Sequence, residues 1–70
     1  MKLSTRNQLP ATVTEVIRGE AMAVVKLTLS GGEQMVSSIT NDAVTDLGLE
    51  PGRQVLALIK STEVAMAVDV

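Results

Sequence analysis

The chain has 70 residues, of which 46% are hydrophobic, and it contains no aromatic residue, no Cys and no His. These absences exclude a disulfide framework and a Cys/His zinc site, and they suit a reducing compartment. The formal net charge of −2 comes from six Lys and Arg and eight Asp and Glu spread along the chain, so we expect no basic surface for nucleic acid.

The length predicts a single domain, residues 1–70, that associates with copies of itself. A core of this size rarely supplies more than about 3–5 kcal/mol of stability, and small domains without disulfides or metals commonly gain support by oligomerisation. No apolar run has the length of a signal peptide or the roughly 20 residues of a membrane span. We therefore expect a cytoplasmic protein that does not enter a membrane.

The first half of the chain predicts three strands joined by two turns. The β-branched run 11–17 indicates the first strand, and residues 18–20 form the turn after it. Residues 22–29 alternate between two faces, which is the period of a strand. The glycines of 30–33 allow positive φ angles, so residues 34–39 return as the partner strand of a hairpin.

The second half predicts a short helix and two further strands. Thr40, Asn41 and Asp42 offer N-cap side chains, and Gly48 suits the left-handed residue at a helix end. Residues 50–53 fit a type II turn that leads into a strand at 55–59. The last run, 64–68, has no polar face, so we expect a fifth strand that pairs or packs between subunits.

Three strands, a short helix and two strands indicate an all-β fold. This order is typical of a small OB-like five-stranded Greek-key barrel with one short helix between the third and fourth strands.

Two polar stretches near opposite ends of the chain predict an oxyanion pocket. Residues 4–7 and 60–61 combine hydroxyls, cations and amides in a chain otherwise rich in aliphatic side chains. A tetrahedral dianion offers only acceptor oxygens, so its site needs converging N–H and O–H donors and partial charge neutralisation. The same residues also fit a plain strand start and solvated cations on an edge strand, and Thr40 fits a plain helix cap.

Four segments carry a resemblance that covers nearly the whole chain. They are Ser4-Thr5-Arg6-Asn7-Gln8-Leu9, Ile39-Thr40-Asn41-Asp42, Leu47-Gly48-Leu49-Glu50-Pro51-Gly52 and Ala57-Leu58-Ile59-Lys60-Ser61. In their order and spacing they resemble the molbindin family of small molybdate-binding proteins, also called Mop or TOBE-type domains. The resemblance implies an OB-like barrel, an intracellular homohexamer arranged as a trimer of dimers, and molybdate or tungstate bound at subunit interfaces.

The resemblance also implies a set of site residues. Those that match the family's anion site are Ser4, Thr5, Arg6, Thr40, Lys60 and Ser61. Thr40 looks like a contribution from the neighbouring subunit. Two positions depart from the family's pattern: Ala43 stands where relatives often have Ser, and Met22 stands where they often have Asn. The first removes a hydroxyl donor, and the second weakens the case for a second anion site at the turn 18–22.

The function predicted from these features is the binding and storage or buffering of molybdate or tungstate, without catalysis or a catalytic cofactor. A structural or ligand-sensing module that acts through a protein partner is the alternative. A nucleic-acid module is disfavoured because its groove needs aromatic platforms and basic lining. An enzyme is disfavoured because the chain has neither a nucleophile–base pair nor a cluster of metal ligands.

Overall fold

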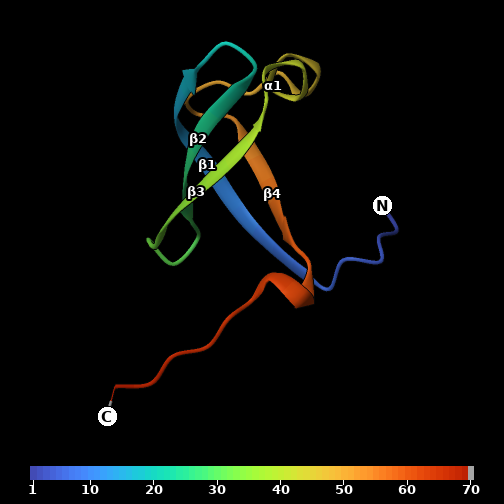
Figure 1. The fold of residues 1–70 in the computed structure, drawn as a ribbon, viewed down its shortest axis with the longest axis vertical. Helices are drawn as coiled ribbons and strands as arrows, with labels where there is room; N and C mark the ends of the chain where they lie inside the picture. The colour runs from blue at the N-terminus through green and yellow to red at the C-terminus, as the bar shows by residue number, and fades with distance from the viewer. Residues whose placement is uncertain (70) are drawn as a thin grey trace.

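A computed structural model describes residues 1–69 as one curled antiparallel sheet with a short helix at one end (Figure 1). The elements are β1 (Asn7–Arg18), β2 (Met22–Leu29), β3 (Gln34–Thr40), α1 (Asn41–Leu47), β4 (Gln54–Ile59) and the 3-10 turn η1 (Ser61–Glu63). The order in the sheet is β3-β2-β1-β4. The predicted all-β architecture, with its helix between the third and fourth strands, is confirmed. The described helices include none that is long and apolar enough to cross a membrane.

Strand β1 joins the two halves of the sheet. Its first half pairs with β4, from Asn7 opposite Ile59 to Thr12 opposite Gln54. Its second half pairs with β2, and the register shifts between Val13 and Glu15. A bulge of this kind bends the strand and increases its twist, so β1 turns from one partner to the other and the sheet curls.

The core lies on the concave side of this sheet. Its buried residues are Ala11, Val13, Ala23, Val25, Leu27 and Val44. Three of them come from β2 and follow the predicted alternation, whereas Lys26 between them is exposed. Val44 closes the core from α1 and is 1% exposed. All of these side chains are aliphatic and small, so the core of one chain is thin.

The turns and helix caps form where the sequence predicts them. The Thr40 hydroxyl accepts a hydrogen bond from the Ala43 amide at 3.1 Å, which satisfies an N–H at the start of α1. Gly48 ends the helix with φ of 63°. The Arg53 amide donates to the Glu50 carbonyl at 3.0 Å, and Gly52 has φ of 94°, as a type II turn requires.

The first strand is longer than predicted. It begins at Asn7, and the β-branched run begins only at Ala11. Residues 7–10 have weak strand propensity and include Pro10, but each pairs with a residue of β4. Pairing between distant segments overrides local propensity here.

Residues 64–68 do not form the predicted fifth strand. Within residues 1–69 they have no ladder partner and run as an extended tail away from the sheet (Figure 1). A strand needs backbone hydrogen bonds to a neighbouring strand, and η1 turns the chain away from β4 before the tail begins. The side chains of Met66 and Val68 are 89% and 83% exposed.

Candidate anion-binding site

The candidate site is an open pocket where β1 begins and β4 ends. Because the two strands are antiparallel and Asn7 lies opposite Ile59, the residues before β1 and those after β4 lie side by side. The pocket has a volume of about 230 Å³, and its lining residues are Ser4, Thr5, Arg6, Lys60, Ser61 and Thr62. Every one of these side chains carries a hydrogen-bond donor.

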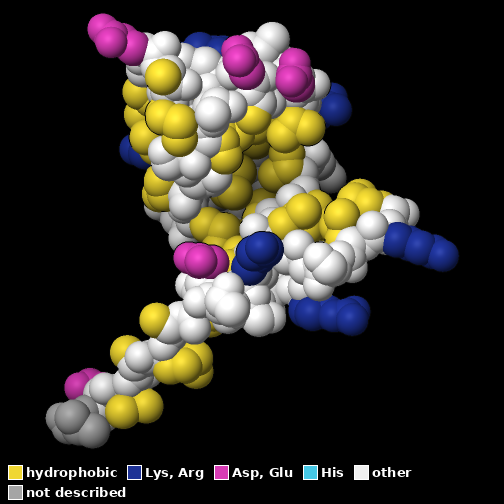
Figure 2. All heavy atoms as spheres, turned by 45° about the vertical axis from the view of Figure 1, so that its right-hand side comes forward, with side chains coloured by type: hydrophobic (Ala, Val, Ile, Leu, Met, Phe, Trp, Pro, Cys, Tyr) yellow, Lys and Arg dark blue, Asp and Glu magenta, His cyan; other side chains and the backbone are white. Residues whose placement is uncertain are grey.

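Among residues 1–69, the cationic and hydroxyl side chains of this pocket donate to no other group of the protein. Arg6 and Lys60 are both exposed and form no ion pair among residues 1–69. Figure 2 shows dark blue cationic side chains around the region where the two ends of the chain leave the body. Two cations and four hydroxyl groups therefore face one small volume, which is the composition that an oxyanion requires.

Three hydrogen bonds hold the backbone around the pocket. The Asn7 side-chain amide donates to the Ile59 carbonyl at 3.1 Å and links the two halves. The Gln8 side-chain amide donates to the Thr5 carbonyl at 2.8 Å and holds the segment before β1. On the other side, the Glu63 amide donates to the Lys60 carbonyl at 2.9 Å and forms η1.

The structure brings together five of the six predicted residues. Thr40 lies elsewhere, at the end of β3, where it pairs with Met22 and caps α1. That end of the sheet is opposite to the end where Asn7 meets Ile59 (Figure 1). The sequence reasoning missed Thr62, although its position beside Ser61 in a hydroxyl-bearing run was a visible signal.

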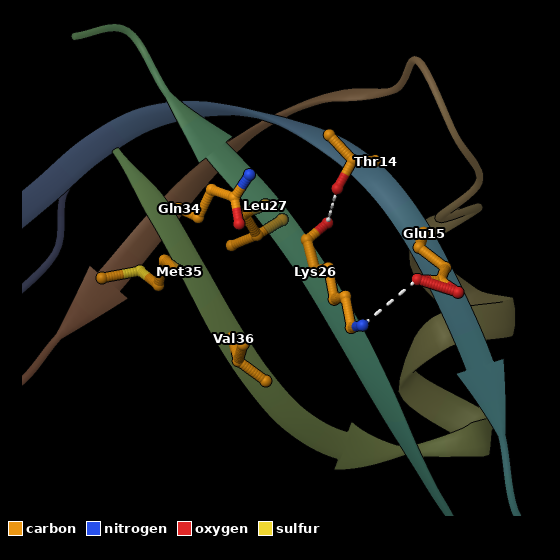
Figure 3. Close-up of a pocket in the computed structure, with 7 residues that line it drawn as sticks. All are labelled: Thr14, Glu15, Lys26, Leu27, Gln34, Met35 and Val36. Carbon is orange, nitrogen blue, oxygen red and sulfur yellow. Dashed lines mark hydrogen bonds and ion pairs between the residues drawn. The ribbon is translucent and has the colours of Figure 1, made fainter. Parts of the chain in front are cut away.

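A larger groove crosses the middle of the sheet (Figure 3). It has a volume of about 460 Å³, and its lining residues are Thr14, Glu15, Lys26, Leu27, Gln34, Met35 and Val36. The Lys26 ammonium lies 3.3 Å from a carboxylate oxygen of Glu15. This carboxylate neutralises the Lys26 ammonium and would repel an anion that entered the groove. The smaller pocket is therefore the better candidate for an oxyanion.

At the turn after β1, the Arg18 side chain is held by two hydrogen bonds to neutral groups of the chain. The Arg18 guanidinium donates to the Asn41 carbonyl and to the Thr45 hydroxyl, each at 3.2 Å. Its hydrogen bonds therefore join the end of β1 to α1. Within residues 1–69, no group of His, Cys, Asp and Glu side chains is placed to hold a metal ion directly.

Comparison with protein families and curated proteins gives a consistent result. The model of the TOBE domain matches residues 3–66. Molybdenum-pterin-binding protein 3 of Clostridium pasteurianum is 42% identical over 64 residues, which cover 91% of this chain and 94% of that protein. The molybdenum transport protein ModE of Herbaspirillum seropedicae is 46% identical over 67 residues, which cover 96% of this chain but only 25% of ModE.

Solved structures share the fold, and their sequence identity to this chain is close to that of the two relatives above. A molybdate-binding protein from Sporomusa ovata superposes with a TM-score of 0.92 at 44% identity, covering 97% of this chain and all of that one. The cytoplasmic molybdate-binding protein ModG, with molybdate bound, superposes with a TM-score of 0.83 at 43% identity. The match covers 87% of this chain and 43% of ModG. These neighbours bear out the OB-like class of the fold.

Proposed function

We propose that this chain binds molybdate, because it belongs to the TOBE domain family and to its branch of small molybdenum-pterin-binding proteins. The observation that carries the proposal is the pocket of Ser4, Thr5, Arg6, Lys60 and Ser61, in which two cations and three hydroxyls have no partner among residues 1–69. The proposal treats residues 1–70 as one such domain.

Affinity in this pocket comes from local donors. The net charge of −2 gives no long-range attraction for a dianion. Hydrogen bonds that involve a charged group contribute about 1.5–3 kcal/mol each. Three or four of them supply about 4.5–12 kcal/mol, which exceeds an association cost of about 4 kcal/mol, and the upper end of this range corresponds to about micromolar binding. Arg6 and Lys60 are the charge partners, and Ser4, Ser61 and backbone amides are the fixed donors.

The size of the anion sets the selectivity. Molybdate and tungstate are larger than sulfate, so donors spaced for the larger ion contact the smaller one incompletely. Tungstate therefore competes with molybdate at this pocket, whereas sulfate competes weakly.

The assembly in this proposal is a homo-oligomer, the homohexamer that the family resemblance implies. The extended tail supports it, because Val64, Met66 and Val68 are exposed and a patch of this kind on a small protein marks a contact surface. Leu56 and Leu58 on β4 add to the exposed apolar area. Figure 2 shows yellow side chains along the tail and over one side of the body. Thr40, at the far end of its own sheet, reaches a pocket only in a neighbouring copy.

The role we propose is cytoplasmic storage or buffering of the anion, without catalysis. One observation favours a second candidate, a sensing module that acts through a protein partner: ModE holds the matching region as about a quarter of a longer protein. The two roles differ in whether the purified oligomer alone takes up stoichiometric anion.

Calorimetric titration of the anion-stripped protein tests the function. Molybdate is the titrant, tungstate is the comparator, and excess sulfate is the competitor. We expect stoichiometric heat with molybdate that sulfate does not remove, from a particle whose molar mass by light scattering is a multiple of 7.4 kDa. No heat with molybdate or tungstate would refute the proposal.

A further inference from the structure

The segment before β1 is attached to the rest of the molecule by few hydrogen bonds. Residues 1–6 lie outside any strand or helix, yet they supply Ser4, Thr5 and Arg6 to the pocket. Outside the strand ladders, one hydrogen bond among residues 1–69 holds this segment, and it runs from the Gln8 side chain to the Thr5 carbonyl. Half of the pocket therefore depends on one exposed side chain for its position.

Asn7, the residue next to Gln8, connects the two halves of the pocket. The Asn7 side chain donates to the Ile59 carbonyl, across 52 positions of sequence, immediately beside Lys60. Both carboxamides use their N–H groups on backbone carbonyls of the two segments that form the pocket. Neither residue lines the pocket itself, so neither is a ligand by geometry.

We propose that Gln8 and Asn7 are positioning residues of the anion pocket, an inference that rests on the proposed function. Gln8 fixes the shape of residues 4–6, and Asn7 fixes the distance between residues 4–6 and residues 60–62. A segment that is already in its bound shape does not have to be ordered when the ligand arrives, so binding is tighter. A fixed distance between the two segments also keeps the donors at the separation that suits the larger anion, so that sulfate binds less well.

The decisive variant is Gln8→Met, which keeps the length of the side chain and removes its N–H donor. The matched control is Gln54→Met, because Gln54 is also an exposed amide on the β1–β4 ladder and forms no side-chain hydrogen bond among residues 1–69. We expect Gln8→Met to weaken molybdate binding roughly 2- to 12-fold, the loss of one neutral hydrogen bond. The control keeps the wild-type Kd.

Four further readouts separate positioning from general stability. In the anion-free Gln8→Met protein the melting temperature shifts by less than about 4 °C. Amide hydrogen exchange in the core at Val25 keeps its wild-type rate. The ratio of sulfate to molybdate Kd decreases. In a double-mutant cycle with Ser4→Ala the two losses are not additive, because Gln8 acts through the segment that carries Ser4.

A second variant, Asn7→Leu, removes the donor between the two halves and keeps most of the side-chain volume. It has the same direction of effect on affinity and selectivity. If the wild type binds molybdate and Gln8→Met matches the Gln54→Met control in Kd and selectivity, the inference is wrong while the proposed function stands. If the wild type gives no heat with molybdate, the proposed function fails and the positioning role fails with it.

Discussion

The central groove and the terminal pocket of this sheet differ in whether their cations are paired, and for anion binding this difference matters more than their volumes. The central groove is about 460 Å³ and holds one cation, Lys26, beside the carboxylate of Glu15. The terminal pocket is about 230 Å³ and holds Arg6 and Lys60 without an acidic partner among residues 1–69. From this comparison we expect a cation to serve an anion site only where the fold leaves it unpaired.

The largest effect is expected when a free cation is removed. Arg6→Ala or Lys60→Ala should weaken molybdate binding by about 1.5–3 kcal/mol, roughly 10- to 150-fold, because each loses a charged hydrogen-bond donor. Lys26→Ala is the matched control from the central groove and should leave the titration unchanged. Unchanged binding in both pocket variants, measured by calorimetry, would show that the anion binds elsewhere.

The next largest effect is expected at Thr40, where two roles are separable. Thr40→Val removes the helix cap and should lower the free energy of unfolding by about 1 kcal/mol. If a neighbouring copy also presents this hydroxyl to the pocket, molybdate affinity falls as well. Thr40→Ser keeps the hydroxyl and should preserve both quantities. A stability loss in Thr40→Val with wild-type affinity would limit Thr40 to capping.

A smaller effect is expected for a single hydroxyl of the pocket. Ser61→Ala should weaken binding by about 0.5–1.5 kcal/mol, since one neutral donor is lost. Ser38→Ala, an exposed serine on β3, is the control. Equal Kd values for these two variants, measured in the same titration series, would remove Ser61 from the site.

The smallest effect is expected from opening the ion pair in the central groove. Glu15→Gln should cost only about 0.2–1 kcal/mol of stability, because both side chains are about half exposed and surface pairs contribute little. We expect the number of anions bound per chain to stay constant, since a lone Lys26 has no converging donors. An added molybdate site in Glu15→Gln would mean that pairing alone kept this groove from binding.

The composition and local patterns predicted much of the fold. The alternation along 22–29 placed the buried face of β2, and the glycines of the turns placed both hairpin and helix ends. The types of residue in the candidate pocket were also visible, because hydroxyls and cations stand out in an aliphatic chain. Thr62 was missed although it extends the same hydroxyl-bearing run, because the family resemblance that selected the site residues ended at Ser61.

The start of β1 and the fate of the tail were not predictable from local sequence. Residues 7–10 became a strand because β4 lies opposite them, not because of their propensity. Residues 64–68 have high propensity but no partner strand within the described chain. A strand forms only when a second segment pairs with it, whereas propensity is a property of the one segment alone.

Apart from residues 7–10, the sequence by itself determined the local conformations: which runs are extended, where the chain turns, and where the helix begins and ends. It did so because backbone angles and side-chain periodicity depend on residues a few positions apart. Only the tertiary structure decided which cations are free, because that depends on the β1–β4 register. This register brings Arg6 next to Lys60, and the β1–β2 register places Lys26 opposite Glu15.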